Sequence, residues 1–356
     1  MDGTHLNNKI GIVGGGITGL ISAYFLSLEG YKVDLYEKKT LLSETSSKTT
    51  KLIHGGIRYL ENLQFHEVKN GINDRKWWLE NFPNETKLQE IIILSKKKLS
   101  PEIFKFFFGI KVYETFAGRS NIKTGRLYKQ DNLLSLGIKN NISAGISFYD
   151  GLMQESLGQE IIKRCKSNGV NFYENNEIKS IRSEARIEEK QYKKIIIATG
   201  PWASSFLKQN KIDTNKTIDY IKGSHLIINR KIKKGLMFRD QKKHRYIFAL
   251  PYQGNLLLGT TEQRVRSPED NHVLDSEVNY LLESINIYID RPINKDEIIK
   301  SYSGVRPLIK SKAQDFHSSS RDFYIQKDHN LLSLFGGKWT TAPSIARNIV
   351  RIVNNE

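Results

Sequence analysis

The chain has 356 residues, 38% of them hydrophobic, which is enough for two domains with a sizeable core. The single cysteine, Cys165, excludes an internal disulfide, and the eight histidines lack metal-ligand spacing, so we expect no metal site. No apolar run is long enough to span a bilayer, and residues 1–8 are polar and carry no signal-peptide pattern. Together with the cysteine count, these features predict a cytoplasmic protein.

The formal net charge of +17 has two interpretations. A basic surface attracts anions such as a phosphorylated substrate, anionic lipid or nucleic acid. The alternative is a general compositional bias toward lysine, which we favour for most of these residues. No interleaved aromatic and glycine signature of RNA binding is present, so we expect no nucleic-acid partner.

A glycine-rich turn follows the first predicted strand. Lys9–Val13 is short, apolar and β-branched, and Gly14–Gly19 comes directly after it. A helix over Ile17–Leu28, a second strand over Tyr31–Tyr36 and the acidic Glu37 complete the pattern. Glycine spacing in a strand–turn–helix–strand context, with the acid at this distance, is typical of a dinucleotide site.

Each residue of this motif has a physical role. Gly14 permits the tight turn, Gly16 lets a pyrophosphate approach the backbone, and Gly19 lets helix and strand pack closely. Glu37 accepts hydrogen bonds from ribose hydroxyls and repels a 2′-phosphate, which argues against NADP. The helix N-terminus attracts the pyrophosphate through the N–H groups of its first residues, Ile17 and Thr18. The motif alone does not separate NAD from FAD.

A second polar segment lies downstream. Thr45–Lys51 is rich in hydroxyls and leads into residues 52–60, where two adjacent glycines lie among His54, Arg58 and Tyr59. Its hydroxyls and backbone donors suit a phosphate or the edge of an isoalloxazine. The alternative is an N-cap cluster before a helix.

The next elements alternate between helix and strand. The pattern predicts a helix over Phe65–Asn81 and a strand over Ile91–Leu94. The basic, aromatic segment 96–113 is too short and too charged to cross a bilayer. It suits either a membrane interface or a core helix with a solvated lysine flank, and the sequence leaves both open.

A further βα-type unit is predicted from a strand over Ile142–Tyr149, a helix over Gln154–Asn168 and a strand over Val170–Tyr173. A buried strand over Lys194–Ala198 then ends in a tight turn, Thr199–Ala203, which brings backbone close to a ligand again.

From residue 219 the pattern changes to strands separated by polar turns, which predicts an antiparallel sheet and a second domain up to residue 328. A helical insertion is expected over Ser276–Ile289. The last strand is Leu331–Phe335, and Pro343 suits the first turn of a terminal helix that ends near Val353. The strands predicted within the sheet are Tyr220–Asn229, Tyr246–Leu250, Asn255–Thr260, Ile298–Val305 and Phe323–Gln326.

Several segments, in order along the chain, together resemble the FAD-dependent glycerol-3-phosphate dehydrogenase family. They are Thr45–Ser47 with Lys51–Glu61, Ala198–Trp202, Lys222–His225, Gly259–Thr261, Tyr302–Leu308, Arg321–Asp322 and Phe335–Thr341. This set is far more specific than a glycine motif, because it extends from near the N-terminus to near the C-terminus.

The resemblance implies a D-amino-acid-oxidase-like fold of the α/β class. Counting its antiparallel substrate domain, the chain is α+β overall. A discontinuous Rossmann-like FAD-binding domain (1–90, 142–215 and 329–356) would carry an antiparallel substrate-binding domain (91–141 and 216–328). It implies non-covalent FAD and oxidation of sn-glycerol 3-phosphate to dihydroxyacetone phosphate. Electrons would pass to quinone or another acceptor. In its membrane-interface interpretation, segment 96–113 would make peripheral contact with the inner face of the cell membrane.

The resemblance also implies roles for individual residues. Arg306 and Arg321 would clamp the phosphate, with Arg58, Tyr59 and Lys338 nearby. Lys338 would also stabilise charge on the reduced flavin or on the developing ketone oxygen. His225 is the preferred general base and His54 the rival, so the predicted catalytic residues are His225, His54, Arg58 and Lys338. The N-terminus of the terminal helix would point toward the flavin pyrimidine. The predicted cofactor-binding residues are Gly14, Gly16, Ile17, Thr18, Gly19, Glu37, Thr45, Ser46, Ser47, Lys51, Leu52, Gly200, Trp202, Gly337, Lys338, Trp339 and Thr340.

The chain departs from the family pattern at several places. Met153–Leu157 lacks the usual acidic pair, and Ala342–Pro343 replaces a Tyr–Arg pair. Glu262 stands where an aspartate is common, and Ser180–Tyr192 is short. Because the sequence ends at Glu356, we expect a truncated form that lacks the family's helical C-terminal domain. We therefore keep two alternatives: a related flavoenzyme acting on another hydroxy acid, amino acid or phosphorylated polyol, and a basic flavoprotein that binds membrane or nucleic acid without chemistry.

Overall fold

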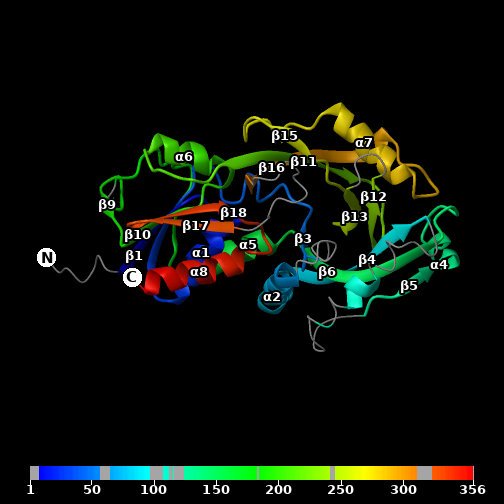
Figure 1. Ribbon diagram of the computed structural model, residues 1–356, viewed down its shortest axis with the longest axis horizontal. Coiled ribbons are helices and arrows are strands. Elements are labelled where there is room, and N and C mark those ends of the chain that lie inside the picture. Colours follow the sequence, from blue (N-terminus) through cyan, green and yellow to red (C-terminus); the bar gives the residue numbers. More distant parts are fainter. Residues whose placement is uncertain are drawn as a thin grey trace.

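The computed structural model describes residues 8–56, 65–96, 107–111, 115, 124–182, 184–240, 245–310 and 323–355. The predictions for Arg58, Tyr59, Arg321 and most of 96–113 fall outside this part of the chain. The molecule is elongated. A six-stranded sheet and its helices form one end, and a ten-stranded sheet forms the other (Figure 1).

The six-stranded sheet has the order β17-β18-β10-β1-β2-β7 and is parallel except for β17. Its strands are β1 (Lys9–Val13), β2 (Lys32–Tyr36), β7 (Asn171–Tyr173), β10 (Lys194–Ile197), β17 (Phe323–Asp328) and β18 (Leu331–Gly336). The associated elements are α1 (Ile17–Leu28), α5 (Leu157–Ser167), the 3-10 helix η3 (Gly200–Trp202), α6 (Ala203–Gln209), α8 (Ala342–Asn354) and the hairpin β8 (Arg186–Ile187) and β9 (Lys190–Gln191).

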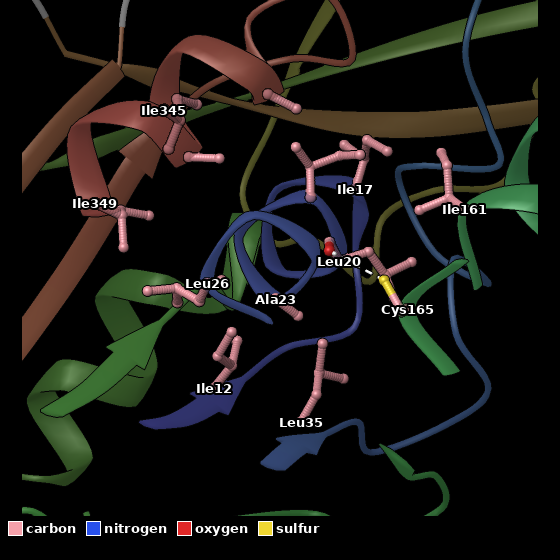
Figure 2. Close-up of a cluster of buried hydrophobic side chains, with 14 of the residues drawn as sticks. Ile12, Ile17, Leu20, Ala23, Leu26, Leu35, Ile161, Cys165, Ile345 and Ile349 are labelled. Carbon is pink, nitrogen blue, oxygen red and sulfur yellow. Dashed lines mark hydrogen bonds between the residues drawn. The ribbon is translucent and has the colours of Figure 1, made fainter. Parts of the chain in front are cut away.

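Helix α1 is the centre of this end of the molecule. Figure 2 shows Leu20, Ala23 and Leu26 of α1 packed between Ile12 and Leu35 of the sheet and side chains of α5 and α8. A buried leucine contributes about 1.5–3 kcal/mol, so this packing fixes α1 firmly behind the glycine turn. Cys165 is buried here, with its Sγ 3.5 Å from the carbonyl oxygen of Leu20. The opposite face of the sheet is covered by α6.

The ten-stranded sheet has the order β15-β11-β14-β13-β12-β4-β6-β3, with β16 on β11 and β5 on β6. All its pairs are antiparallel except β12–β4. Its strands are β3 (Leu52–Ile53), β4 (Thr86–Ser95), β5 (Leu127–Lys129), β6 (Ala144–Met153), β11 (Ile218–Ile228), β12 (Gly235–Arg239), β13 (Tyr246–Tyr252), β14 (Asn255–Gly259), β15 (Gln263–Val265) and β16 (Ile298–Ile309). The helices on this side are α2 (Phe65–Asn81), α4 (Gln130–Leu134), α7 (Asp275–Asn286) and η4 (Lys295–Glu297). Helix α7 packs Leu281 and Ile285 onto the sheet.

Most predicted elements are confirmed. The predicted bounds of α1 and α2 are those of the structure, and β11, β13, β14, β16 and β18 lie where strands are expected. Gly30 follows α1 with a φ of +84°, and Pro343 lies in the first turn of α8. Polar segment 45–51 leads into β3, so its interpretation as an N-cap cluster before a helix is wrong.

Two strands belong to a different sheet from the one predicted. The sequence places β6 in a βα unit of the cofactor domain, but β6 pairs antiparallel with β4 along its whole length. All ten residues of β6 are buried, and a strand buried on both faces carries no sign of its partner's direction. β17, predicted for the antiparallel sheet, pairs with β18 in the six-stranded sheet because only two residues, 329 and 330, connect them. The division of the strands between the two sheets therefore does not follow the predicted domain boundaries. One of those boundaries, 90/91, falls inside β4.

In the described part of the chain, no helix is both long and apolar enough to cross a bilayer. The same residues contain no group of acidic, histidine and cysteine side chains that suits a metal ion.

Candidate active site

The glycine turn lies at the carboxyl ends of β10, β1 and β2. Open α/β sheets bind their ligands in a crevice at this edge, and we refer to this region as the crevice. Gly14 has a φ of +111°, and a Cβ on it would lie 2.4 Å from the carbonyl oxygen of Ala198. A Cβ on Gly19 would lie 2.0 Å from the carbonyl oxygen of Gly14. Larger residues are sterically excluded at both positions, as the sequence predicts for a dinucleotide turn.

Backbone donors and one carboxylate surround this turn. Gly15 N donates to Glu37 Oε2 at 2.7 Å, and Lys39 N donates to Oε1 at 2.9 Å. Glu37 is therefore held at the edge of the crevice, where a ribose would lie. Ile17 N donates to Ser46 Oγ at 3.0 Å, and the first turn of α1 carries no acidic residue. The positive end of the α1 dipole is thus left for an anion.

The crevice also contains an unsatisfied polar atom. Thr199 Oγ1 is buried, with no hydrogen-bond partner among the described residues, and Thr199 directly follows Ala198 at the glycine turn. Buried polar atoms are normally paired, so this hydroxyl suits a ligand group. A Cβ on Gly16 would meet only Ser46 Oγ within 4 Å, at 3.3 Å, so a ligand can approach the backbone there. Together these features fit the ADP half of a dinucleotide.

Four segments that are distant in sequence meet beside this crevice. Trp339 Nε1 donates to the carbonyl oxygen of Ser46 at 2.8 Å, and Thr45 Oγ1 donates to the carbonyl oxygen of Val305 at 2.9 Å. A Cβ on Gly337, whose φ is +84°, would lie 3.6 Å from Thr18 Oγ1. The structure thus brings together the loops at 45–51 and 337–341 and helix α1, which the sequence predicts around one cofactor, and β16, which carries the predicted substrate residue Arg306.

His54 lies at the β18–α8 end of this site. Its N–H donates to Thr340 Oγ1 at 3.2 Å. The next N–H, of Gly55, donates at 2.9 Å to Asp150 Oδ1, which also pairs with Arg75 at 3.0 Å. The buried Asp150–Arg75 pair therefore fixes the His54 backbone, a role that the sequence does not reveal because an isolated aspartate and arginine carry no pairing signal.

His225 lies in a different place, on β11. Its Nε2 is 2.9 Å from Thr50 Oγ1, its ring stacks on Tyr302 with centroids 5.0 Å apart, and Nδ1 has no partner among the described residues. Burial lowers the pKa of His225 well below its usual value, and the positive charges of Arg306, Lys51 and Arg245 lower it further. The imidazole is therefore neutral at physiological pH and able to accept a proton.

The arginines beside His225 are linked through one carboxylate. Arg306 Nη2 donates to Thr260 Oγ1 at 3.1 Å, and Arg306 Nη1 lies 3.9 Å from Glu262. Arg245 Nη2 lies 3.5 Å from the other oxygen of Glu262, and Arg245 is 5% exposed. We call Arg245, Glu262 and Arg306 the arginine cluster. Sequence reasoning missed Arg245, because a buried arginine cannot be distinguished from a surface one without its partner.

Lys51 lies close to the same histidine. Its Nζ donates to the carbonyl oxygen of Ser47 at 2.6 Å and lies 5.9 Å from the ring centroids of both Tyr252 and Tyr302. Burial lowers the pKa of Lys51 to about 8. Lys51 thus lies between the loop at 45–51 and the ten-stranded sheet.

The remaining predicted residues differ in their surroundings. Leu52 is part of the hydrophobic core, and the Ser47 hydroxyl donates within its own turn, to the carbonyl oxygens of Ser43 and Glu44. Lys338 N donates to Thr341 Oγ1 at 3.1 Å, directly before α8. Gly200 opens η3 with a φ of +55°, and Trp202 ends it.

Trp202 lies on the β10 side of the glycine turn, at the end of η3. Its indole N–H donates to Glu269 Oε1 at 2.7 Å, and Lys38 Nζ lies 3.6 Å from the ring centroid. Lys38 follows β2 and Trp202 follows β10, so this contact joins the two sides of the central strand β1.

Comparisons with known proteins agree with this geometry. A family profile described as FAD dependent oxidoreductase matches residues 9–352. The aerobic glycerol-3-phosphate dehydrogenase of Staphylococcus saprophyticus is 30% identical over 368 residues, which cover 96% of this chain and 66% of that enzyme. The chain thus spans just under two thirds of that relative's length.

Two solved structures share the fold. L-alpha-glycerophosphate oxidase from Mycoplasma pneumoniae, with FAD bound, superposes with a TM-score of 0.77 at 20% identity, over 97% of this chain and 94% of that chain. Glycine oxidase from Geobacillus kaustophilus gives 0.76 at 16% identity, over 98% and 95%. The family match over nearly the whole chain, and a crevice that fits a dinucleotide, show that this protein belongs to the FAD-dependent oxidoreductases and that its cofactor is FAD.

Proposed function

We propose that this protein oxidises sn-glycerol 3-phosphate to dihydroxyacetone phosphate and passes the electrons to quinone or another acceptor. The arginine cluster beside a neutral His225 is the observation that carries the proposal. Two arginines share one carboxylate there, so the cluster keeps a net positive charge for an anionic substrate. The name of the Staphylococcus relative supports glycerol 3-phosphate as that substrate.

Arg306 is the residue that we assign to the phosphate. Its side chain is 29% exposed, more than that of Glu262, and Thr260 fixes one edge of the guanidinium. A partly exposed guanidinium in a cluster of net positive charge suits phosphate oxygens. Arg321, Arg58 and Tyr59 remain predictions for the same role.

His225 is the residue that we assign to the substrate hydroxyl. A neutral imidazole accepts the hydroxyl proton at Nδ1, while Thr50 and the Tyr302 ring hold its orientation. Bound FAD supplies the acceptor at N5 for the hydride that leaves C2. Lys338 and the N-terminus of α8 remain predicted at the pyrimidine side of the cofactor, since Lys338 lies in the loop that directly precedes α8. His54, whose backbone meets the same loop, remains the rival base.

The test is a visible spectrum of the FAD-loaded protein under anaerobic conditions. We expect sn-glycerol 3-phosphate to bleach the flavin band, and glycerol and glycine at the same concentration to leave it unchanged. Bleaching by glycine or a 2-hydroxy acid instead would support the alternative of a related oxidoreductase, consistent with the fold shared with glycine oxidase.

A further inference from the structure

Helix α7, which the sequence shows only as an insertion, contains a buried carboxylate. Glu277 is 7% exposed, and its oxygens take part in three hydrogen bonds or ion pairs with described residues. Oε2 pairs with Lys222 Nζ at 2.9 Å and accepts the Leu274 N–H at 3.0 Å, the bond by which the Glu277 side chain caps α7. Lys222 donates in addition to the carbonyl oxygen of His272 at 2.9 Å.

The other oxygen of Glu277, Oε1, faces the ten-stranded sheet. Thr261 Oγ1 donates to Glu277 Oε1 at 2.7 Å and accepts the Ser224 N–H at 2.9 Å. Thr261 N donates back to the carbonyl oxygen of Ser224 at 3.2 Å. A single carboxylate therefore fixes Thr261 against Ser224, at the point where β14 has ended and β11 continues.

The neighbours of these two residues are site residues. Thr260 binds Arg306, and His225 follows Ser224. The backbone packs tightly against both site residues. A Cβ on Gly223 would lie 2.7 Å from Arg306 Nη2, and a Cβ on Gly259 would lie 2.3 Å from His225 Cδ2. A shift of Thr261 must therefore move the arginine cluster and the histidine, because close-packed interiors transmit displacement.

The charge of Glu277 is compensated locally. Burial opposes its ionisation, but hydrogen bonds from Lys222 and Thr261 outweigh this and hold the pKa of the carboxyl below its usual range. Because Lys222 neutralises it, Glu277 can order the site without competing for Arg306, whose carboxylate partner is Glu262.

We propose that Glu277 is a positioning residue of the active site, which acts through Thr261 on Arg306 and His225. The identity of the bound anion rests on the proposed function, but the positioning itself does not.

The test is a double-mutant cycle on the FAD-loaded protein. Glu277→Ala and Thr261→Val should each raise KM for glycerol 3-phosphate about tenfold, and the double variant should also show about tenfold rather than about a hundredfold, because coupled residues are not additive. Glu90→Ala is the matched control. Glu90 is 9% exposed, pairs with Lys234 at 3.1 Å in the same sheet, and touches none of the site residues above. Glu90→Ala should lower the free energy of unfolding and leave KM for glycerol 3-phosphate unchanged.

A second readout does not depend on turnover. In protein labelled with 13C-histidine, the His225 resonance, assigned by its loss in His225→Gln, should shift in Glu277→Ala and Thr261→Val but not in Glu90→Ala. An unshifted resonance in both variants, or a Glu277→Ala variant that loses only stability as Glu90→Ala does, would overturn the positioning role. If wild-type protein does not turn over glycerol 3-phosphate, the proposed substrate fails, and the histidine resonance still decides for or against Glu277.

Discussion

The cofactor crevice and the arginine cluster bind charged groups by opposite means. At the crevice, backbone N–H groups, a helix end and glycines make the site, and Glu37 is the charged side chain that contacts the glycine turn through Gly15 N. At the cluster, side chains make the site: Arg245, Arg306 and Glu262 converge with His225 from separate segments. The first site depends on sterics within a short stretch of chain, and the second on the register of strands far apart in sequence.

The steric side of this comparison gives the largest expected effect. Gly19→Ala places a methyl group 2.0 Å from the carbonyl oxygen of Gly14, so the turn must open and FAD binding should be lost. Gly30→Ala is the control, since no atom lies within 4 Å of its Cβ and only its φ of +84° is strained. It should cost about 1–2 kcal/mol of stability and retain FAD. Flavin absorbance after gel filtration measures the retention of FAD by both variants. Retention of FAD by Gly19→Ala would contradict the role of the glycine turn in FAD binding.

Removal of one arginine should have the next largest effect. Arg306→Ala should raise KM for glycerol 3-phosphate about a hundredfold, because a hydrogen bond to a charged group contributes about 1.5–3 kcal/mol. Arg264 lies on neighbouring β15, is exposed, and pairs with Asp219 at 3.0 Å. Arg264→Ala should therefore leave KM unchanged. Equal effects of the two variants in steady-state kinetics would show that general positive charge, and not the cluster, binds the substrate.

The burial of His225 predicts a dependence on pH. Because its folded-state pKa is lowered, the unfolded chain binds a proton that the folded chain does not, once the pH falls below the unfolded pKa of about 6.5. Above that pH, neutral His225 makes its full contribution to the free energy of unfolding. Below it, each pH unit down to the folded-state pKa lowers the free energy of unfolding by about 1.4 kcal/mol. Urea unfolding at pH 7.5 and 5.5 should show a smaller acid loss in His225→Gln than in wild type.

The same lowered pKa has a kinetic counterpart. If His225 is the base, the acid limb of kcat/KM should lie below pH 6.5 in wild type and disappear in His225→Gln. An acid limb that survives in this variant would favour His54 as the base.

The smallest expected effect tests the contact between Lys38 and Trp202. Lys38→Met removes the ammonium group that lies 3.6 Å from the Trp202 ring centroid, and should speed FAD release about two- to fivefold, since an exposed cation–π contact contributes about 0.5–1 kcal/mol. Lys39→Met is the matched control, because Lys39 pairs with Glu44 instead. The rate of FAD release is measured by flavin fluorescence after dilution. Equal release rates for the two variants would show that Lys38 does not help to retain FAD.

The sequence by itself determined the cofactor end of this protein. The glycine turn, α1 and Glu37 are close in the chain, and their steric and dipolar requirements are local, so spacing alone located them. The ordered family segments further marked Arg306, His225 and Lys338 as candidate site residues, without showing how they are held.

Tertiary structure decided the rest. The sheets to which β6 and β17 belong, the partnership of Arg245 with Arg306 through Glu262, and the contact of α7 with Thr261 all depend on pairings between residues far apart in sequence. A buried strand carries no sign of its partner, and a charged side chain carries no sign of its counter-charge. Only the packed chain, in which desolvation forces each buried charge to find an opposite one, assigns those partners.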